Sequence, residues 1–199
     1  MARQQCNHCG FSLKTCLCDA ISIVNNRIKI IILRHPSEQK NSKNTAHLLT
    51  LGLKSYALYN GESTHDFAVI DTLPIATTAL LYPDEQAMLL DNDAIQTDFS
   101  KAPLTHLVVI DGTWKKAYKI RQLTPSLANF RCLSFAQLPE NKYSIRKAPR
   151  ADSLSTLEAV AHSLYLLEQA DVQPLYTLLA ALVDKQTSYM PSNVKARYQ

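Results

Sequence analysis

The residues best suited to chemistry form a turn, Asp111-Gly112-Thr113-Trp114, directly after the apolar run from Leu104 to Ile110. The carboxylate of Asp111 could serve as a general base, and Trp114 offers a flat ring for stacking on a nucleobase. Gly112 permits a close backbone approach. A plain strand-to-helix turn, with Asp or Thr capping and Trp in the core, explains the same residues, and their spacing alone favours that interpretation.

A second group of polar residues lies between Tyr143 and Glu158. Its cations, Arg146, Lys147 and Arg150, could bind phosphate or carboxylate groups. Ser155 and Thr156 open a predicted helix, whose first turn is a favourable place for an anion. An exposed basic loop followed by an ordinary capped helix is the alternative, since capping alone explains Ser155 and Glu158.

Four of the five cysteines are gathered near the N-terminus, as Cys6, Cys9, Cys16 and Cys18. Two close pairs of thiols are typical of a structural zinc site. His8 could compete as a ligand, and free thiols at the terminus are the alternative. Because a four-cysteine knuckle fills every coordination position from the protein, we expect structural rather than catalytic zinc.

Alternating strands and helices must position these groups. Buried strands are predicted at residues 27–33, 77–82 and 104–110, with shorter ones at 55–59 and 130–135. Helices are predicted at residues 44–52, 84–90, 114–123, 155–169 and 174–187. This alternation predicts an α/β fold with a largely parallel sheet flanked by helices. Ligands of such sheets bind beyond the carboxyl ends of the strands, where the loops Arg34-His35-Pro36, Tyr82-Pro83-Asp84 and Asp111–Trp114 meet.

Charge is distributed unevenly along the chain. Residues 60–114 hold nine acidic residues and one basic residue, whereas residues 115–150 hold nine basic residues and one acidic residue. A basic stretch with interleaved aromatic residues suits a nucleic acid. The alternative is that the basic stretch pairs with the acidic one or faces solvent.

Composition is that of an ordinary globular protein, with 46% hydrophobic and 19% charged residues in 199. No apolar run is long enough for a membrane span, and the N-terminus lacks a signal-peptide pattern. We therefore expect a cytoplasmic protein without membrane association; the sequence makes no prediction of its oligomeric state. With four glycines in the chain and no glycine-rich phosphate loop, a nucleotide-containing cofactor must be held by another loop design.

In this order, these motifs resemble the DTW-domain family of tRNA-uridine aminocarboxypropyltransferases. The matches run from the cysteines through Arg34-His35-Pro36, Leu81-Tyr82-Pro83, Ile110–Trp114 and Tyr143-x2-Arg146-x2-Pro149 to Leu154–Ala159. The resemblance implies a SPOUT-like fold with a C-terminal trefoil knot. It divides the chain into a zinc-binding head, residues 1–22, and a catalytic domain, residues 23–199.

The resemblance also implies the reaction. The 3-amino-3-carboxypropyl group of S-adenosylmethionine would pass to N3 of a uridine in tRNA, releasing 5′-methylthioadenosine. Asp111 would be catalytic. Cofactor binding would fall to Leu81, Tyr82, Pro83, Gly112, Thr113, Trp114, Arg146, Ser155 and Thr156, and RNA binding to Arg34, His35, Lys115, Lys116, Lys147 and Arg150. Two other functions fit the motifs less well: an RNA methyltransferase using the same cofactor, and a non-catalytic zinc-containing RNA-binding protein.

Overall fold

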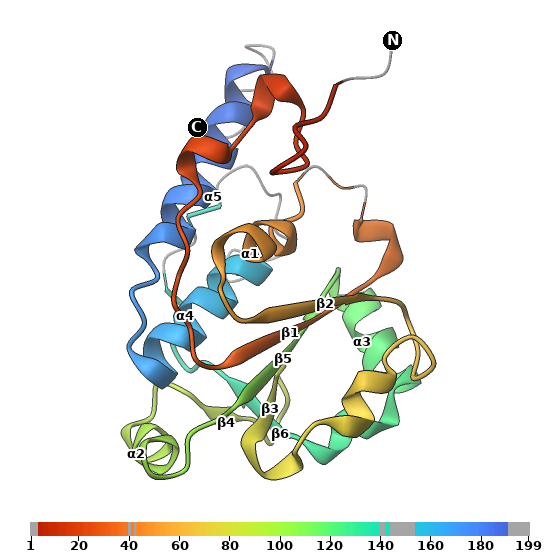
Figure 1. The fold of residues 1–199 in the computed structure, drawn as a ribbon. Helices are drawn as coiled ribbons and strands as arrows, with labels where there is room; N and C mark the ends of the chain where they lie inside the picture. Colours follow the sequence, from red (N-terminus) through yellow and green to blue (C-terminus); the bar gives the residue numbers. More distant parts are fainter. Residues whose placement is uncertain (1–3, 40, 42, 140–141, 144–153, 191–199) are drawn as a thin grey trace.

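A parallel six-stranded sheet forms the centre of the protein, as seen in a computed structural model that describes residues 4–39, 41, 43–139, 142–143 and 154–190 (Figure 1). The strand order is β2-β1-β5-β3-β6-β4, and every neighbouring pair is parallel. The strands are β1 (Lys29–Arg34), β2 (Tyr56–Asn60), β3 (Thr78–Leu81), β4 (Met88–Leu89), β5 (His106–Asp111) and β6 (Arg131–Ser134). The predicted α/β class and parallel sheet are confirmed.

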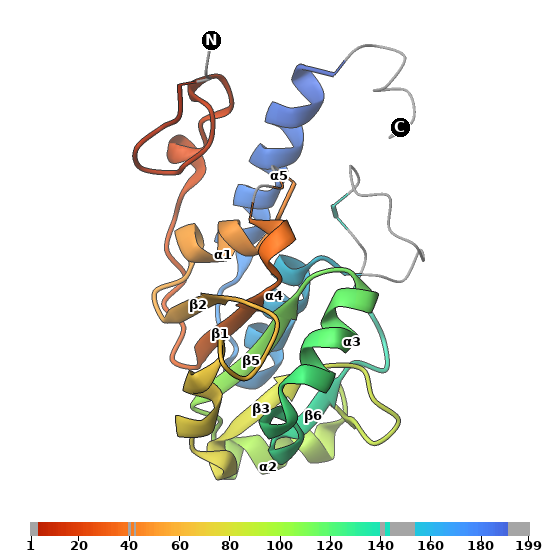
Figure 2. The ribbon, with the colours of Figure 1, turned by 90° about the vertical axis from the view of Figure 1, so that its right-hand side faces the viewer.

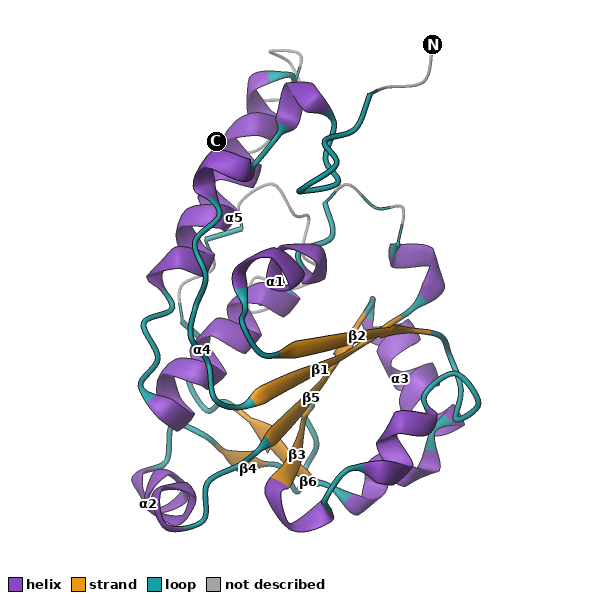
Figure 3. Ribbon diagram, viewed as in Figure 1, coloured by secondary structure: helices purple, strands orange, loops and turns teal. Residues whose placement is uncertain are grey.

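Helices cover both faces of this sheet (Figures 2 and 3). On one face, α1 (Ala46–Gly52), α2 (Asp93–Lys101), α4 (Thr156–Glu168) and α5 (Gln173–Ser188) contribute to the larger apolar core. On the other face, α3 (Trp114–Leu123) and two short 3-10 helices contribute to a smaller core. Side chains at Ile30–Leu33 alternate between the two cores, which explains why that strand is an unbroken apolar run.

Local sequence signals fix several element ends. Ser155 and Glu158 form the predicted capping box at the start of α4: the Ser155 hydroxyl accepts from the Glu158 N–H, and the Glu158 carboxylate accepts from the Ser155 N–H at 2.8 Å. Helix α4 ends where Gln169 adopts a left-handed conformation, at φ 52°. Helix α3 has the bounds that the sequence predicts.

The predicted helix at residues 84–90 is wrong. One carboxylate oxygen of Asp84 accepts a hydrogen bond from the Gln86 N–H, which favours a turn over a helix. The following Met88–Leu89 then pairs with β6 as an edge strand. The helix in this region instead begins later, at Asp93, and was not predicted.

The cysteine-rich head packs against α1 and α5. Leu17 is buried within the larger core, the His47 ring is 2.8 Å from the backbone oxygen of Cys9, and the Tyr189 hydroxyl donates to the backbone oxygen of Lys14. A boundary at residue 22 therefore stays a prediction. Within the described part of the chain, no helix is both long and apolar enough to span a membrane.

Candidate functional site

A cavity of about 590 Å³ opens at the carboxyl ends of β3, β5 and β6, beside the first turns of α3 and α4. This volume lies within the range of small-molecule sites, roughly 300–1,000 Å³. Its wall is formed by Leu81, Tyr82, Pro83, Val109, Ile110, Gly112, Trp114, Ala117, Leu133, Ser134, Phe135, Ala136, Leu138, Leu154, Ser155, Thr156 and Ala159.

Seven of the predicted cofactor-binding residues line this cavity, in three groups that are distant in sequence. They are Leu81, Tyr82, Pro83, Gly112, Trp114, Ser155 and Thr156. Parallel pairing of β3 with β5 brings the first two groups together, and the start of α4 supplies the third. Their roles toward a ligand remain predictions.

Thr113 does not join them. It precedes α3 as its N-cap, but its side chain makes no capping hydrogen bond, and it is absent from the cavity wall. Arg146, together with Lys147 and Arg150, lies outside the described residues.

Sequence reasoning missed one wall of the cavity. This wall consists of Ser134, the last residue of β6, and of Phe135, Ala136 and Leu138 after it. Strand β6 pairs with β3 although some 50 residues separate them. The sequence offers a weak signal there, a short predicted strand ending at Phe135. Without the strand order, nothing places that strand beside the other loops.

Residues outside the cavity wall contact its aromatic side chains and help to fix their position. The rings of Tyr82 and Trp114 meet edge to face with centroids 6.4 Å apart. The Arg121 guanidinium lies 4.7 Å from the Tyr82 ring centroid and forms an ion pair with Asp84 at 2.6 Å. Burial raises the pKa of Tyr82, so its hydroxyl stays neutral and can donate a hydrogen bond. Trp114 is half exposed, which leaves its ring accessible to a ligand.

Asp111 lies behind the cavity wall rather than on it. The residue is only 5% exposed. The Asn44 amide donates to one carboxylate oxygen at 2.6 Å, and the Thr156 hydroxyl donates to the other at 2.7 Å. The His35 N–H donates to its backbone oxygen. Asp111 therefore connects β5 to the segment before α1, to the start of α4 and to the loop after β1. Asn44 was not among the predicted site residues.

Burial dominates the electrostatics of Asp111 and raises the pKa of its carboxyl group. The hydrogen bonds from Asn44 and Thr156 oppose this effect because they stabilise the charged form. Of the nearby charges, Glu38 raises the pKa and Arg34 lowers it. A raised pKa makes the carboxylate a stronger proton acceptor than an exposed aspartate.

Most of the predicted RNA-binding residues in the described chain have partners. Arg34 donates to the Asn60 side chain at 2.8 Å, His35 contacts the carboxylate of Glu62, and Lys116 forms an ion pair with Glu38 at 2.8 Å. Lys115 is exposed at the start of α3.

Pairing between the two oppositely charged stretches also occurs. Lys119 contacts Glu62, and Arg121 contacts Asp84. The alternative that the basic stretch is neutralised by the acidic one therefore holds for part of α3. RNA binding by this helix stays a prediction.

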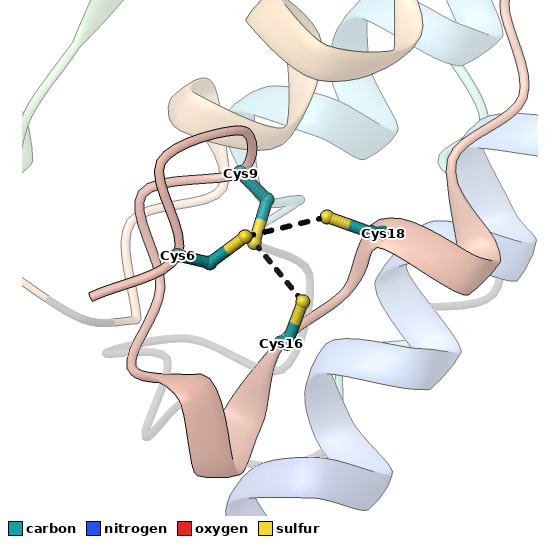
Figure 4. Close-up of side chains that lie close together, drawn as sticks. All are labelled: Cys6, Cys9, Cys16 and Cys18. Carbon is teal, nitrogen blue, oxygen red and sulfur yellow. Dashed lines mark hydrogen bonds between the residues drawn. The ribbon is translucent and has the colours of Figure 1, made fainter. Parts of the chain in front are cut away.

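The head brings four cysteine sulfurs together in an arrangement that fits zinc (Figure 4). The sulfurs of Cys6, Cys9, Cys16 and Cys18 all lie within 4.8 Å of one another. Cys6 and Cys18 are 3.5 Å apart, and Cys9 and Cys16 are 3.7 Å apart. Tetrahedral zinc with Zn–S bonds of about 2.3 Å separates its sulfurs by roughly 3.8 Å. Both separations exceed a disulfide bond.

The backbone of the head favours a thiolate at one of the four positions. Backbone N–H groups of Cys9 and His8 lower the pKa of the Cys6 thiol to about 6, whereas side-chain hydrogen bonds with Cys16 and Cys6 raise the pKa of the Cys18 thiol to about 12. Gly10 follows with φ +74°, a left-handed conformation that favours glycine and turns the chain around the sulfurs. The His8 ring contacts Cys18 at 3.5 Å, beside the cluster. The structure thus brings together the four predicted metal ligands.

Comparison with known proteins gives a family match over most of the chain. The family model of the DTW domain matches residues 3–187. A Drosophila melanogaster protein named tRNA-uridine aminocarboxypropyltransferase 2 is 34% identical over 196 residues, covering 92% of this chain and 76% of its own. An Arabidopsis thaliana protein named tRNA-uridine aminocarboxypropyltransferase A is 27% identical and covers 99% and 88%. No solved structure gave a significant match.

Proposed function

Because the chain belongs to the DTW-domain family, we propose that it is a tRNA-uridine aminocarboxypropyltransferase that moves the 3-amino-3-carboxypropyl group of S-adenosylmethionine to N3 of a uridine in tRNA. The enzyme class and the tRNA substrate follow from the names of its relatives. The donor and the N3 position are our extension.

The observation that carries this proposal is the cavity at the sheet edge. Its size suits a nucleoside-containing ligand. Its wall combines apolar side chains with the polar residues Ser155 and Thr156 and with Trp114. We assign adenine stacking to Trp114 or Tyr82, and contacts with the ligand's polar groups to Ser155 and Thr156.

S-adenosylmethionine supplies a methionine γ-carbon activated by the adjacent sulfonium, with 5′-methylthioadenosine as the leaving group. The protein must choose this carbon over the methyl group, and that choice is one of orientation, because reacting atoms must approach to about 3–3.5 Å. The segments at the ends of the neighbouring strands β3 and β6 both line the cavity and would restrict how the ligand can lie. Asp111 is the proposed acceptor for the N3 proton.

Other parts of the chain would hold tRNA. Lys115 is exposed one residue beyond Trp114 and is suited to a phosphate. The same role is proposed for Lys116, Arg34, His35, Lys147 and Arg150, and a carboxylate or phosphate contact for Arg146. Ion pairs such as Lys116–Glu38 would have to be exchanged for phosphate on binding.

Zinc at Cys6, Cys9, Cys16 and Cys18 would serve as a structural ion that stabilises the head. The SPOUT-like classification, the C-terminal knot and a cytoplasmic location also remain proposals. The knot depends on the path of residues 144–153, which lie outside the described part.

The direct test is to incubate the purified protein with tRNA and S-adenosylmethionine and to identify the modified nucleoside by mass spectrometry. We expect a uridine carrying the aminocarboxypropyl mass, with ordinary fragmentation of the ribose. A methylated nucleoside would instead support an RNA methyltransferase. Binding of tRNA without any modification or cofactor binding would support a non-catalytic RNA-binding protein.

A further inference from the structure

A proton acceptor must reach its substrate, yet the Asp111 carboxylate lies behind the cavity wall. The group between them is Thr156, whose side chain is half-buried and lines the cavity. Its hydroxyl is 2.7 Å from Asp111. Thr156 is thus the residue that touches both the buried carboxylate and the ligand space.

The direction of this hydrogen bond follows from its neighbours. The Asn44 amide has its oxygen occupied by the His47 N–H, so its nitrogen faces Asp111 as a donor. An ionised carboxylate accepts from Asn44 and Thr156 at the same time. A threonine hydroxyl has one proton, and here that proton points at Asp111. The lone pairs of the Thr156 oxygen therefore remain to accept a hydrogen bond from a ligand.

We propose that Thr156 relays the substrate proton to Asp111. This inference rests on the proposed function. As the bond between uridine N3 and the γ-carbon forms and the bond between that carbon and sulfur breaks, the N3 proton passes to the Thr156 oxygen. The original hydroxyl proton passes to Asp111. The electron pair of the broken bond neutralises the sulfonium, so 5′-methylthioadenosine leaves uncharged and Asp111 ends protonated.

The surroundings of Asp111 suit the end of such a relay. Burial makes the carboxylate a stronger base than in water. The charged groups that act on it are Glu38, on the 3-10 helix after β1, and Arg34, at the end of β1; their effects oppose each other. Asn44 stays bonded to the second oxygen and holds the carboxyl group in place after it is protonated.

The test replaces the hydroxyl with a methyl group of similar size, in Thr156→Val. We expect the turnover number to fall by about 10²–10⁴-fold, the usual contribution of a positioned proton-transfer group. Affinity for S-adenosylmethionine by calorimetry should fall by no more than about tenfold, the contribution of one hydrogen bond from this wall residue, and so by much less than the turnover number. Thr156→Ser keeps the hydroxyl and should restore most of the rate. Thr156→Ala should repeat the defect, which separates it from any misfit of valine.

A readout specific to proton transfer uses tRNA transcribed with 5-fluorouridine, whose N3 proton is more acidic. The loss of turnover number in Thr156→Val should be smaller on this tRNA, and smaller at higher pH. In both cases the N3 proton leaves more readily, so the reaction depends less on a proton-transfer group. A defect of the same size on both tRNAs would overturn the relay, as would loss of cofactor binding in both hydroxyl-free variants.

The control is Thr177→Val, which removes a hydroxyl bonded within α5, outside the cavity; its activity should be normal on both tRNAs. If the unaltered protein transfers the group and Thr156→Val does so equally fast, the relay is wrong and the proposed function stands. Absence of transfer by the unaltered protein would overturn both.

Discussion

The side-chain amide of Asn44 donates a 2.6 Å hydrogen bond to the buried carboxylate of Asp111. Asn44 lies just before α1, and Asp111 ends β5 in the centre of the sheet. This contact attaches the segment that leads into α1, on one face of the sheet, to the strand end beneath the candidate site. The position of Asp111 therefore depends on how the segment before α1 packs against the sheet.

Asn44→Ala should lower the free energy of unfolding by roughly 1–3 kcal/mol, because a buried carboxylate oxygen loses its donor. Urea unfolding followed by circular dichroism measures the change. Asn25→Ala is the control: its side chain is exposed and accepts from exposed Lys54, so we expect a change within about 0.5 kcal/mol. Equal effects of the two substitutions would contradict the assigned importance of Asn44.

Asp111 should also make stability depend on pH. Its pKa is raised in the folded protein above the ordinary aspartate value of about 3.9, so the folded state holds this proton more tightly than the unfolded state. The resulting contribution to stability is complete below the ordinary value and is lost as the pH rises through the folded pKa. Comparison of unfolding free energies for the unaltered protein and Asp111→Asn across acidic pH isolates it. The unaltered protein should lose stability relative to the variant as pH rises; the opposite trend would show a lowered pKa.

The cysteine cluster should bind about one zinc ion per chain through four thiolates. Metal analysis of the purified protein measures this ratio. Cys16→Ser should reduce the zinc content and lower the melting temperature, because the head packs on α1 and α5. Cys132→Ser, which alters the cysteine outside the cluster in β6, should leave the zinc content unchanged. Retention of full zinc by Cys16→Ser would exclude the proposed ligand set.

Trp114→Ala should weaken binding of S-adenosylmethionine by about 1–3 kcal/mol if the ring stacks on a nucleobase. The effect on folding should be small, since half of the ring is exposed. Tyr165→Ala is matched to it: this exposed aromatic residue of α4 is absent from the cavity wall. Calorimetry with both variants provides the measurement. Unchanged affinity in Trp114→Ala would remove the ring from the cofactor site.

Much of the fold could be predicted because its signals are local. An unbroken apolar run predicts β1, and the Ser155–Glu158 spacing predicts the start of α4. The failure at residues 84–90 has a non-local cause: Met88–Leu89 becomes a strand by pairing with β6. Acidic residues at the start of a segment are typical both of a helix and of a turn like the one that Asp84 closes here, so the sequence pattern cannot distinguish the two.

Part of the candidate site could also be predicted from the sequence. Residues of the site that directly follow strong strands, such as Tyr82 and Gly112, could be found from the sequence. Asn44 and Ser134 could not, because each reaches the site through tertiary contacts. The burial of Asp111 is also a tertiary property, and it changes the role proposed for Thr156 from cofactor contact to proton relay.

The identity of the by-product tests the account most directly. Unaltered protein, tRNA and S-adenosylmethionine are incubated together, and the released nucleosides are separated and quantified by chromatography. Transfer from the γ-carbon predicts 5′-methylthioadenosine, formed only when tRNA is present and in the same amount as the modified uridine. Release of S-adenosylhomocysteine in proportion to modified tRNA would show methyl transfer and contradict the account.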